Sequence, residues 1–133
     1  MNLLRVNFIS VIAATVVAFV FGAVWHDEAV FGGIFMEAMG IVEVDATPLK
    51  MAVEFAKQFL ICLVVAAIAA GLGLKTTEDA FKLSVIVGIG IVGAVIVSQH
   101  TWGGLPMVVT AIDVGYSYVS VLIFSLAACL WGK

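Results

Sequence analysis

Residues 6–25 read VNFISVIAATVVAFVFGAVW, a mostly apolar run that contains no charged side chain. Its length of about 20 residues is what an α-helix needs to cross the hydrocarbon core of a bilayer. Three further stretches of similar character follow, at 55–74, 80–98 and 106–131. The sequence therefore predicts an all-α membrane protein, in which residues 1–133 form a single bundle of four transmembrane helices.

The composition places the chain in the same class of protein. Hydrophobic residues make up 64% of its 133 residues and charged residues only 11%, and the mean hydropathy is +1.24. A soluble domain carries about 25% charged residues, and one of this length leaves a large share of its surface in water. We therefore expect the lipid bilayer to be a partner. The net charge of −3 disfavours binding to a phosphate backbone, so nucleic acid is not an expected partner.

The connection between the first two spans, at 26–50, is long and acidic. Within it, a set of apolar residues recurs at the spacing of one helical face: Phe31, Ile34, Phe35, Ala38 and Met39. This pattern predicts a short amphipathic helix that lies in the membrane interface, with Glu37 toward water.

Thr47 and Pro48 are typical of a helix start, because threonine caps a helix well and proline fits its first position. The second helix is therefore expected to begin at Pro48, ahead of its apolar part at 55–74. Its first turns carry polar and charged residues that we expect to stand in the headgroup region: Lys50, Glu54, Lys57 and Gln58.

Small residues recur inside the spans and predict close helix packing, because glycine and alanine let two backbones approach each other in lipid. The residues expected to pack in this way are Gly22, Ala66, Ala70, Gly73, Gly90 and Gly93. They exceed what four short helices need, so we also expect a homo-oligomer or a partner membrane protein. The segment 88–93 matches the GxGxxG pattern of dinucleotide sites, but it lacks the strand and the helix start that such a site requires.

Lysine and arginine residues near the ends of the spans predict the orientation, since they are enriched in cytoplasmic loops. One side of the membrane carries Arg5, Lys75, Lys82 and Lys133, and the other carries Lys50 and Lys57. This excess predicts that both the N-terminus and the C-terminus are cytoplasmic.

Asp113 is the only carboxylate within 106–131 and lies about 10 Å into the fourth helix. An acid at that depth is costly unless it is paired, hydrated or protonated, so it must face the bundle interior or a cavity. The same region of the helix carries further polar residues: Thr110, Tyr116, Ser117 and Ser120. Two interpretations remain open, a site for a proton, cation or substrate, and a structural carboxylate. The candidate partners of a structural carboxylate are Gln99, His100, Tyr116 and a neighbouring helix.

A second polar cluster is expected at the outer ends of the first and third helices. Its members are Trp25, His26 and Glu28 from the first helix and Gln99, His100 and Trp102 from the third. Two histidines near carboxylates could hold zinc or copper. However, no local motif sets their spacing, and tryptophan with polar neighbours is typical of any membrane interface. We therefore predict no metal site and no cofactor.

The sequence contains no catalytic motif such as HExxH or a nucleophile elbow, so we do not expect an enzyme. The leading hypothesis is a small non-enzymatic membrane protein that associates with itself or packs against partner membrane proteins. The alternative is a small oligomeric transporter or channel that uses Asp113 as an intramembrane acid to couple protons or cations. The two hypotheses differ in whether water reaches Asp113.

Several short blocks carry a family resemblance. They read GAVWH at 22–26, FG at 31–32, MEAMG at 36–40, GLKTT at 73–77 and IDVGY at 112–116. Together they resemble the bacterial membrane proteins grouped as domain of unknown function 1761. His26 and Glu28 stand where that family often has an aromatic residue and then a proline. The resemblance implies a four-helix architecture in a bacterial inner membrane and no assigned activity.

Overall fold

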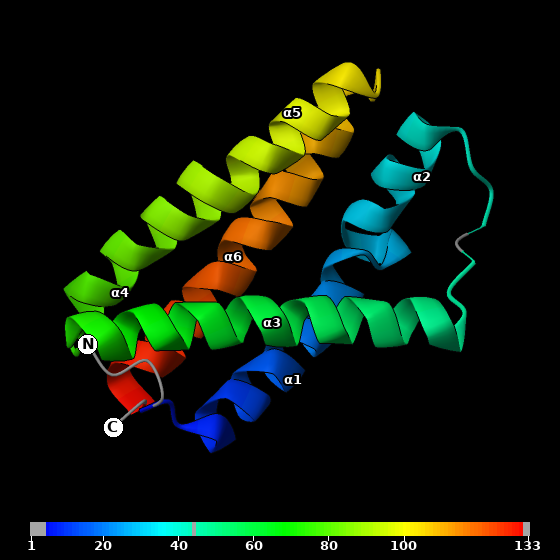
Figure 1. Cartoon of the computed structure of the whole chain (residues 1–133). Helices are drawn as coiled ribbons and strands as arrows, with labels where there is room; N and C mark the ends of the chain where they lie inside the picture. The colour runs from blue at the N-terminus through cyan, green and yellow to red at the C-terminus, as the bar shows by residue number, and fades with distance from the viewer. Residues whose placement is uncertain (1–4, 44, 132–133) are drawn as a thin grey trace.

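The computed structural model describes residues 5–43 and 45–131, which form helices joined by short connections (Figure 1). The elements in chain order are α1 (Phe8–Trp25), η1 (Glu28–Gly32), α2 (Gly33–Met39), α3 (Pro48–Leu72), α4 (Thr77–Ser84), η2 (Val85–Gly93), α5 (Ala94–Trp102) and α6 (Met107–Trp131). No strand occurs in the two described ranges, so the predicted all-α class is confirmed. Lys133, one of the cations that predict the orientation, lies outside them.

Among the described residues, four helical segments are long and apolar enough to cross a membrane: α1, α3, the continuous run Thr77–Trp102 and α6. Only 28–33% of the most apolar part of each segment is buried within the chain. Most of their surface is therefore left for lipid or for another protein. The predicted membrane bundle of four helices is confirmed.

Helix ends differ from the expected bounds where a capping group decides them. α1 begins at Phe8 and not at residue 6, because the side chain of Asn7 accepts the N–H groups of the first turn. The third span continues past residue 98 to Trp102. α3 ends at Leu72, because Gly73 after it has a φ of 67°, the left-handed conformation that favours glycine.

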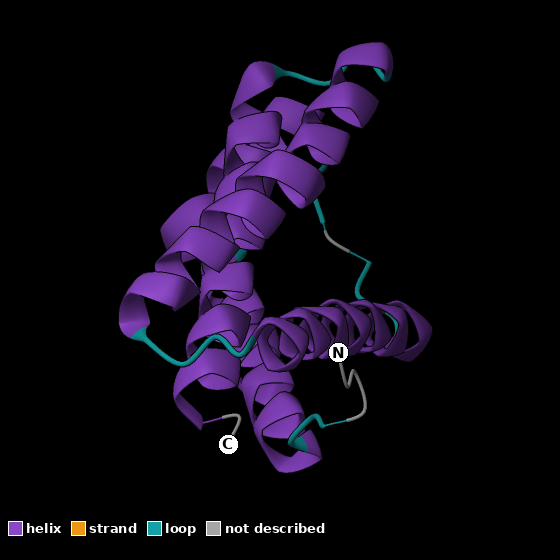
Figure 2. Cartoon of the chain, turned by 60° about the vertical axis from the view of Figure 1, so that its left-hand side comes forward, coloured by secondary structure: helices purple, strands orange, loops and turns teal. Residues whose placement is uncertain are grey.

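α3 lies across the other three spans and does not run alongside them (Figures 1 and 2). It packs against α1 and α6 through one buried face, which carries Gln58, Cys62, Val65 and Ala69. The half of α3 that begins at Pro48 extends away from the bundle (Figure 2). This crossing brings polar residues of that half beside the middle of α6.

The segment between α1 and α3 contains the short helix that was expected, formed by η1 and α2. The chain turns at Asp27, whose side chain accepts the N–H of Ala29, and α2 then packs against α6 beyond the end of α1 (Figure 1). On the expected apolar face, Ile34 and Met39 are exposed, while the remaining members are half-buried. Glu37 is exposed, and a place for this helix in the membrane interface stays a prediction.

α1 and α6 pack through two reciprocal contacts between a glycine and an aromatic ring. Gly22 of α1 lies against Tyr116 of α6, where an added Cβ would stand 2.6 Å from the Tyr116 hydroxyl oxygen. Gly115 of α6 lies against Trp25 of α1, where an added Cβ would stand 3.1 Å from the indole ring. Because each glycine lacks a side chain, the aromatic ring of the other helix can pack directly against its backbone.

Candidate functional site

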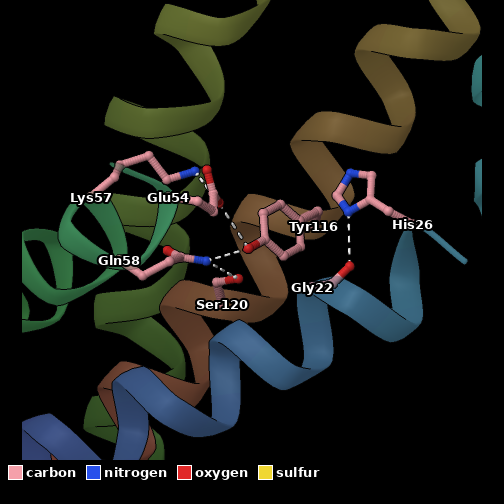
Figure 3. Close-up of polar contacts among 7 residues, drawn as sticks. All are labelled: Gly22, His26, Glu54, Lys57, Gln58, Tyr116 and Ser120. Atoms are coloured by element: carbon pink, nitrogen blue, oxygen red, sulfur yellow. Dashed lines mark hydrogen bonds and ion pairs between the residues drawn. The ribbon is translucent and has the colours of Figure 1, made fainter. Parts of the chain in front are cut away.

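Tyr116 is only 6% exposed and lies at the centre of a polar cluster between α3 and α6 (Figure 3). Its hydroxyl donates a hydrogen bond to Glu54 Oε1 at 3.1 Å and accepts one from Gln58 Nε2 at 2.5 Å. A phenol hydroxyl can donate and accept at once, so the two bonds form together. The tyrosine thereby links two residues that stand one turn apart on α3.

Gln58 is 2% exposed, although it belongs to the polar first half of α3. Its amide nitrogen donates to the hydroxyl of Tyr116 and, at 3.3 Å, to Ser120 Oγ. A buried amide left without hydrogen-bond partners costs about 1–3 kcal/mol, and an apolar bundle offers few such partners. The two hydroxyl groups of α6 are therefore what allows Gln58 to sit inside the protein.

Lys57 adds a positive charge to the same cluster. Its ammonium is 2.8 Å from Glu54 Oε1 and 5.5 Å from the centroid of the Tyr116 ring. The second distance is short enough for a cation–π attraction. Both charged side chains are partly exposed, so the ion pair can be opened by water or by a ligand at low cost.

His26 follows the last turn of α1 and meets the Tyr116 ring edge to face, with 5.0 Å between ring centroids. Its Nδ1 lies 2.9 Å from the carbonyl oxygen of Gly22 (Figure 3). A carbonyl oxygen only accepts, so this bond requires the hydrogen on Nδ1. Nε2 is then the ring nitrogen that can accept a hydrogen bond.

Asp113 of α6 is paired with His100 of α5. The distance from Asp113 Oδ2 to His100 Nε2 is 3.3 Å, and His100 Nδ1 is 3.0 Å from Thr110 Oγ1. The Asp113 side chain remains 28% exposed. The carboxylate therefore has an imidazole partner without being closed off from its surroundings.

A cavity of about 530 Å³ brings the two groups of side chains together. It lies between α1, α3 and α6, and Phe19 and Met51 supply part of its apolar wall. The polar side chains that line it are His26, Asp45, Lys50, Glu54, Lys57, Asp113, Tyr116 and Ser117. Carboxylates, an ammonium and an imidazole thus face one volume, whose size is that of a small-molecule pocket.

The polar residues predicted on α6 have three different surroundings. Thr110 and Asp113 contact His100, Ser117 lines the cavity, and Ser120 is buried against Gln58. Tyr116 belongs to the cavity and to the buried cluster at once. These polar residues of α6 therefore form the wall between the cavity and the buried cluster around Gln58.

The residues expected in the outer-face cluster have different individual surroundings. The indole N–H of Trp25 points inward and donates to the Ile112 carbonyl at 3.1 Å. Glu28 and Gln99 are exposed, and Trp102 is 90% exposed at the end of the longer third span. In 5–43 and 45–131, no three His, Cys, Asp or Glu side chains are grouped as metal ligands would be.

Sequence reasoning missed three members of the site. Glu54, Lys57 and Gln58 were expected in the headgroup region, but the crossing of α3 over α6 places them around Tyr116. The sequence did carry a signal for two of them. Glu54, Gln58 and Cys62 recur at intervals of four, and this is the face of α3 that packs inward.

The predicted packing residues also differ from one another in their contacts. Ala66 and Gly93 are buried, Ala70 is half-buried, and an added Cβ on Gly93 would meet Val114 at 3.5 Å. Gly73 has open space around it and serves to end α3, while Gly90 is exposed. The closest contact between a third-span glycine and another helix is instead at Gly88, where an added Cβ would stand 3.2 Å from the Tyr118 ring.

Comparison with known proteins gives one match. The model of a family described as protein of unknown function (DUF1761) matches residues 9–129, a stretch that reaches from the first turn of α1 to the last turn of α6 and includes every residue of the site. No curated protein and no solved structure matches the chain. Because the match covers nearly the whole sequence, the chain belongs to the family of proteins of unknown function DUF1761.

Proposed function

We propose that this protein is a small membrane transporter, without enzymatic activity, that admits a small polar solute or cation to the cavity around Tyr116. In this proposal Asp113 exchanges a proton for the bound solute. One observation carries it: Asp113 faces a cavity of about 530 Å³ that it shares with Glu54, Lys57 and His26. A purely structural carboxylate would be expected to be enclosed by its partners.

The charges of the cavity fit a site that changes its protonation state. Asp113 has a single ion-pair partner among the described residues, His100 at 3.3 Å. An imidazole nitrogen can donate to an ionised carboxylate or accept from a protonated one, so His100 can partner Asp113 in either state. Ionisable side chains within a membrane span are costly to keep, and they commonly mark the path of an ion or substrate.

Glu54 and Lys57 supply a second adjustable pair across the cavity. Their ion pair is partly exposed, and Tyr116 holds the carboxylate from the buried side. A cationic solute could replace the Lys57 ammonium at Glu54 and over the Tyr116 ring, where the cation now stands. The cavity therefore offers a carboxylate and an aromatic face to the same ligand.

Self-association, the leading hypothesis from the sequence, is a second candidate function, and it is compatible with transport by an oligomer. Gly90 and Ala94 are both exposed and stand one helical turn apart on the outer surface of the third span. An added Cβ on Gly90 would meet nothing closer than 4.0 Å within the chain. A small residue at each of two such positions is a common surface for a second membrane helix.

For the localisation, we propose the bacterial inner membrane with both termini cytoplasmic. This assignment rests on the family and on three cations, Arg5, Lys75 and Lys82. All three lie near the end of the bundle that carries the turn between α3 and α4.

The test of transport is proton flux into liposomes that contain the purified protein and a pH-sensitive dye. An outward gradient of tetramethylammonium, a small cation enclosed in the liposomes, drives the exchange of this cation for protons. We expect Asp113→Asn to reduce it to the level of protein-free liposomes while the protein elutes unchanged in detergent. Glu37→Gln removes an exposed carboxylate outside the cavity and should leave the flux intact. Equal flux through wild type and Asp113→Asn, or no flux through wild type, would overturn the proposal.

A further inference from the structure

A second cavity, of about 410 Å³, lies at the opposite end of the bundle from the Tyr116 cavity. It is formed where the segment before α1, the last turns of α3 and the last turns of α6 meet. The Asn7 side chain closes this end of the bundle by donating to the Trp131 carbonyl at 3.2 Å. Nothing in the proposed transport reaction uses this cavity.

The rim of the cavity carries two positive charges, Arg5 and Lys75. They stand far apart in the sequence, one before α1 and one just after α3, and the packing of α1 on α3 brings them to the same opening. Both residues are exposed, and neither has an ion-pair partner among the described residues. The rim is therefore a free cationic site.

The acids in the neighbouring turn form no ion pair with these two cations. Asp79 accepts the backbone N–H groups of Lys75 and Thr76 at 3.0 Å and 3.1 Å, as the capping residue of α4. Glu78 is paired with Lys82 at 2.6 Å. Neither carboxylate is paired with Arg5 or Lys75, so both cations at the rim can contact an anion.

The wall of the cavity is apolar and built from small side chains. α3 contributes Ala66, Ala69 and Ala70, and Leu74 lies beside them. α6 contributes Ala128 and Cys129. Alanine removes the bulk that would otherwise fill the space between the two helices. The wall can therefore take a hydrocarbon chain that runs along α3 below a charged group at the rim.

We infer that this cavity binds an anionic phospholipid, with its phosphate between Arg5 and Lys75 and one acyl chain along the alanines of α3. Three features of the molecule support the binding of such a lipid. The cations complement a phosphate, the wall complements an acyl chain, and a basic pocket at the end of transmembrane helices stands at the depth of the lipid headgroups. With Arg5 and Lys75 on the cytoplasmic side, the lipid belongs to the cytoplasmic leaflet.

The experiment is native mass spectrometry of the detergent-solubilised protein, titrated with phosphatidylglycerol, phosphatidylcholine or glycerol 3-phosphate. We expect phosphatidylglycerol to bind in preference to phosphatidylcholine, and the soluble phosphate to bind only weakly. Each cation near a headgroup contributes a factor of about five in affinity, so Arg5→Gln combined with Lys75→Gln should weaken phosphatidylglycerol binding about thirtyfold.

The matched control is Lys50→Gln combined with Lys82→Gln, which removes the same charge from residues that do not line this cavity. It should keep the affinity of the wild type. Ala70→Leu keeps both cations but fills the wall, and it should also weaken phosphatidylglycerol binding.

Equal binding of the two phospholipids, or an unchanged affinity in the Arg5 and Lys75 double variant, would overturn the inference. Glycerol 3-phosphate binding as tightly as phosphatidylglycerol would also overturn it, because the site would then recognise a soluble phosphate. Since Arg5 and Lys75 are exposed, the two single variants should fold even if the double variant does not. A loss of lipid binding with intact proton flux, or the reverse, separates this inference from the transport proposal.

Discussion

The hydroxyl of Tyr116 on α6 donates a hydrogen bond to Glu54 on α3 across 3.1 Å, although 62 residues separate them in the chain. The bond ties the base of the cavity to the helix that crosses the bundle. It also fixes the Glu54 carboxylate, whose same oxygen, Oε1, lies 2.8 Å from the Lys57 ammonium at the cavity. The position of α3 and the charge of the site therefore depend on one phenol.

Tyr116→Phe removes this hydroxyl and should lower the free energy of unfolding by about 1–3 kcal/mol, because the buried amide of Gln58 loses its closest acceptor. The measurement is thermal or denaturant unfolding in detergent. Tyr118→Phe is the matched control, because the Tyr118 hydroxyl has only a long contact of 3.5 Å with Ser84. Equal destabilisation by the two changes would mean that the Tyr116 cluster contributes nothing particular to stability.

Gly22→Ala should destabilise the protein by about 1–3 kcal/mol, since overpacking a tight contact forces the neighbouring ring to move. The new Cβ would stand 2.6 Å from the Tyr116 hydroxyl oxygen. Gly90→Ala adds the same methyl group where there is open space, and should be neutral or slightly stabilising. Unfolding in detergent compares the two variants, and a Gly22→Ala protein as stable as Gly90→Ala would contradict the reciprocal packing of α1 and α6.

Asp113→Leu should lower the free energy of unfolding by about 1–3 kcal/mol, because His100 loses its carboxylate partner within the bundle. Asp113→Asn keeps the shape and an acceptor oxygen for His100, so its unfolding should stay close to that of the wild type. The same two proteins can be unfolded in detergent side by side. If both changes destabilise equally, the negative charge itself, and not the hydrogen-bonding capacity, holds α5 to α6.

Gly93→Leu and Gly90→Leu should act on different properties of the protein. Gly93 is buried, and a side chain there meets the backbone of Gly88 and the side chain of Val114, so the Leu variant should unfold more easily. Gly90 is exposed, and its Leu variant should keep the stability of the monomer but lower any oligomer size in detergent. Light scattering coupled to gel filtration measures the second effect, and an unchanged particle mass would exclude Gly90 from an interface.

Single cysteines at Thr77 and Gly103 should label from opposite sides of the membrane, with Thr77 cytoplasmic and Gly103 outside. The native Cys62 and Cys129 are buried, so the background of a membrane-impermeant maleimide should be low. Glu43→Cys should label with Gly103→Cys, because α1 and the third span end on the same side in a four-span bundle. Outside labelling of Thr77→Cys alone would reverse the orientation.

The fold was predictable because the length of an apolar run and the charge of its flanks act locally. The run at 6–25, for example, contains α1 in full. Asp113 was predictable as a special residue for the same reason, since a carboxylate inside an apolar helix stands out without knowledge of its neighbours. His100 was one of its candidate partners, and the structure places it at 3.3 Å.

The site as a whole was not predictable, because it depends on where α3 crosses α6. Charged residues in the first turns of a span are typical of the headgroup region, and Glu54 and Lys57 look like such residues in the sequence. Only the crossing of α3 over α6 sets their depth beside Tyr116. Likewise, the glycines that pack could not be told from Gly90, because the face a glycine presents depends on the π-helical stretch η2.

The hydrogen bond from Asn7 to the Trp131 carbonyl joins positions 124 residues apart, so it has a consequence for biosynthesis. α1 enters the membrane first, but one of its two main partners, α6, is translated last. Until then Gly22 has no Tyr116 beside it, and the polar side chain of Gln58 has neither of its α6 acceptors. A nascent chain of three spans therefore carries an unsatisfied polar group in lipid. We expect it to be held by the insertion machinery, or degraded, until the fourth span closes the bundle.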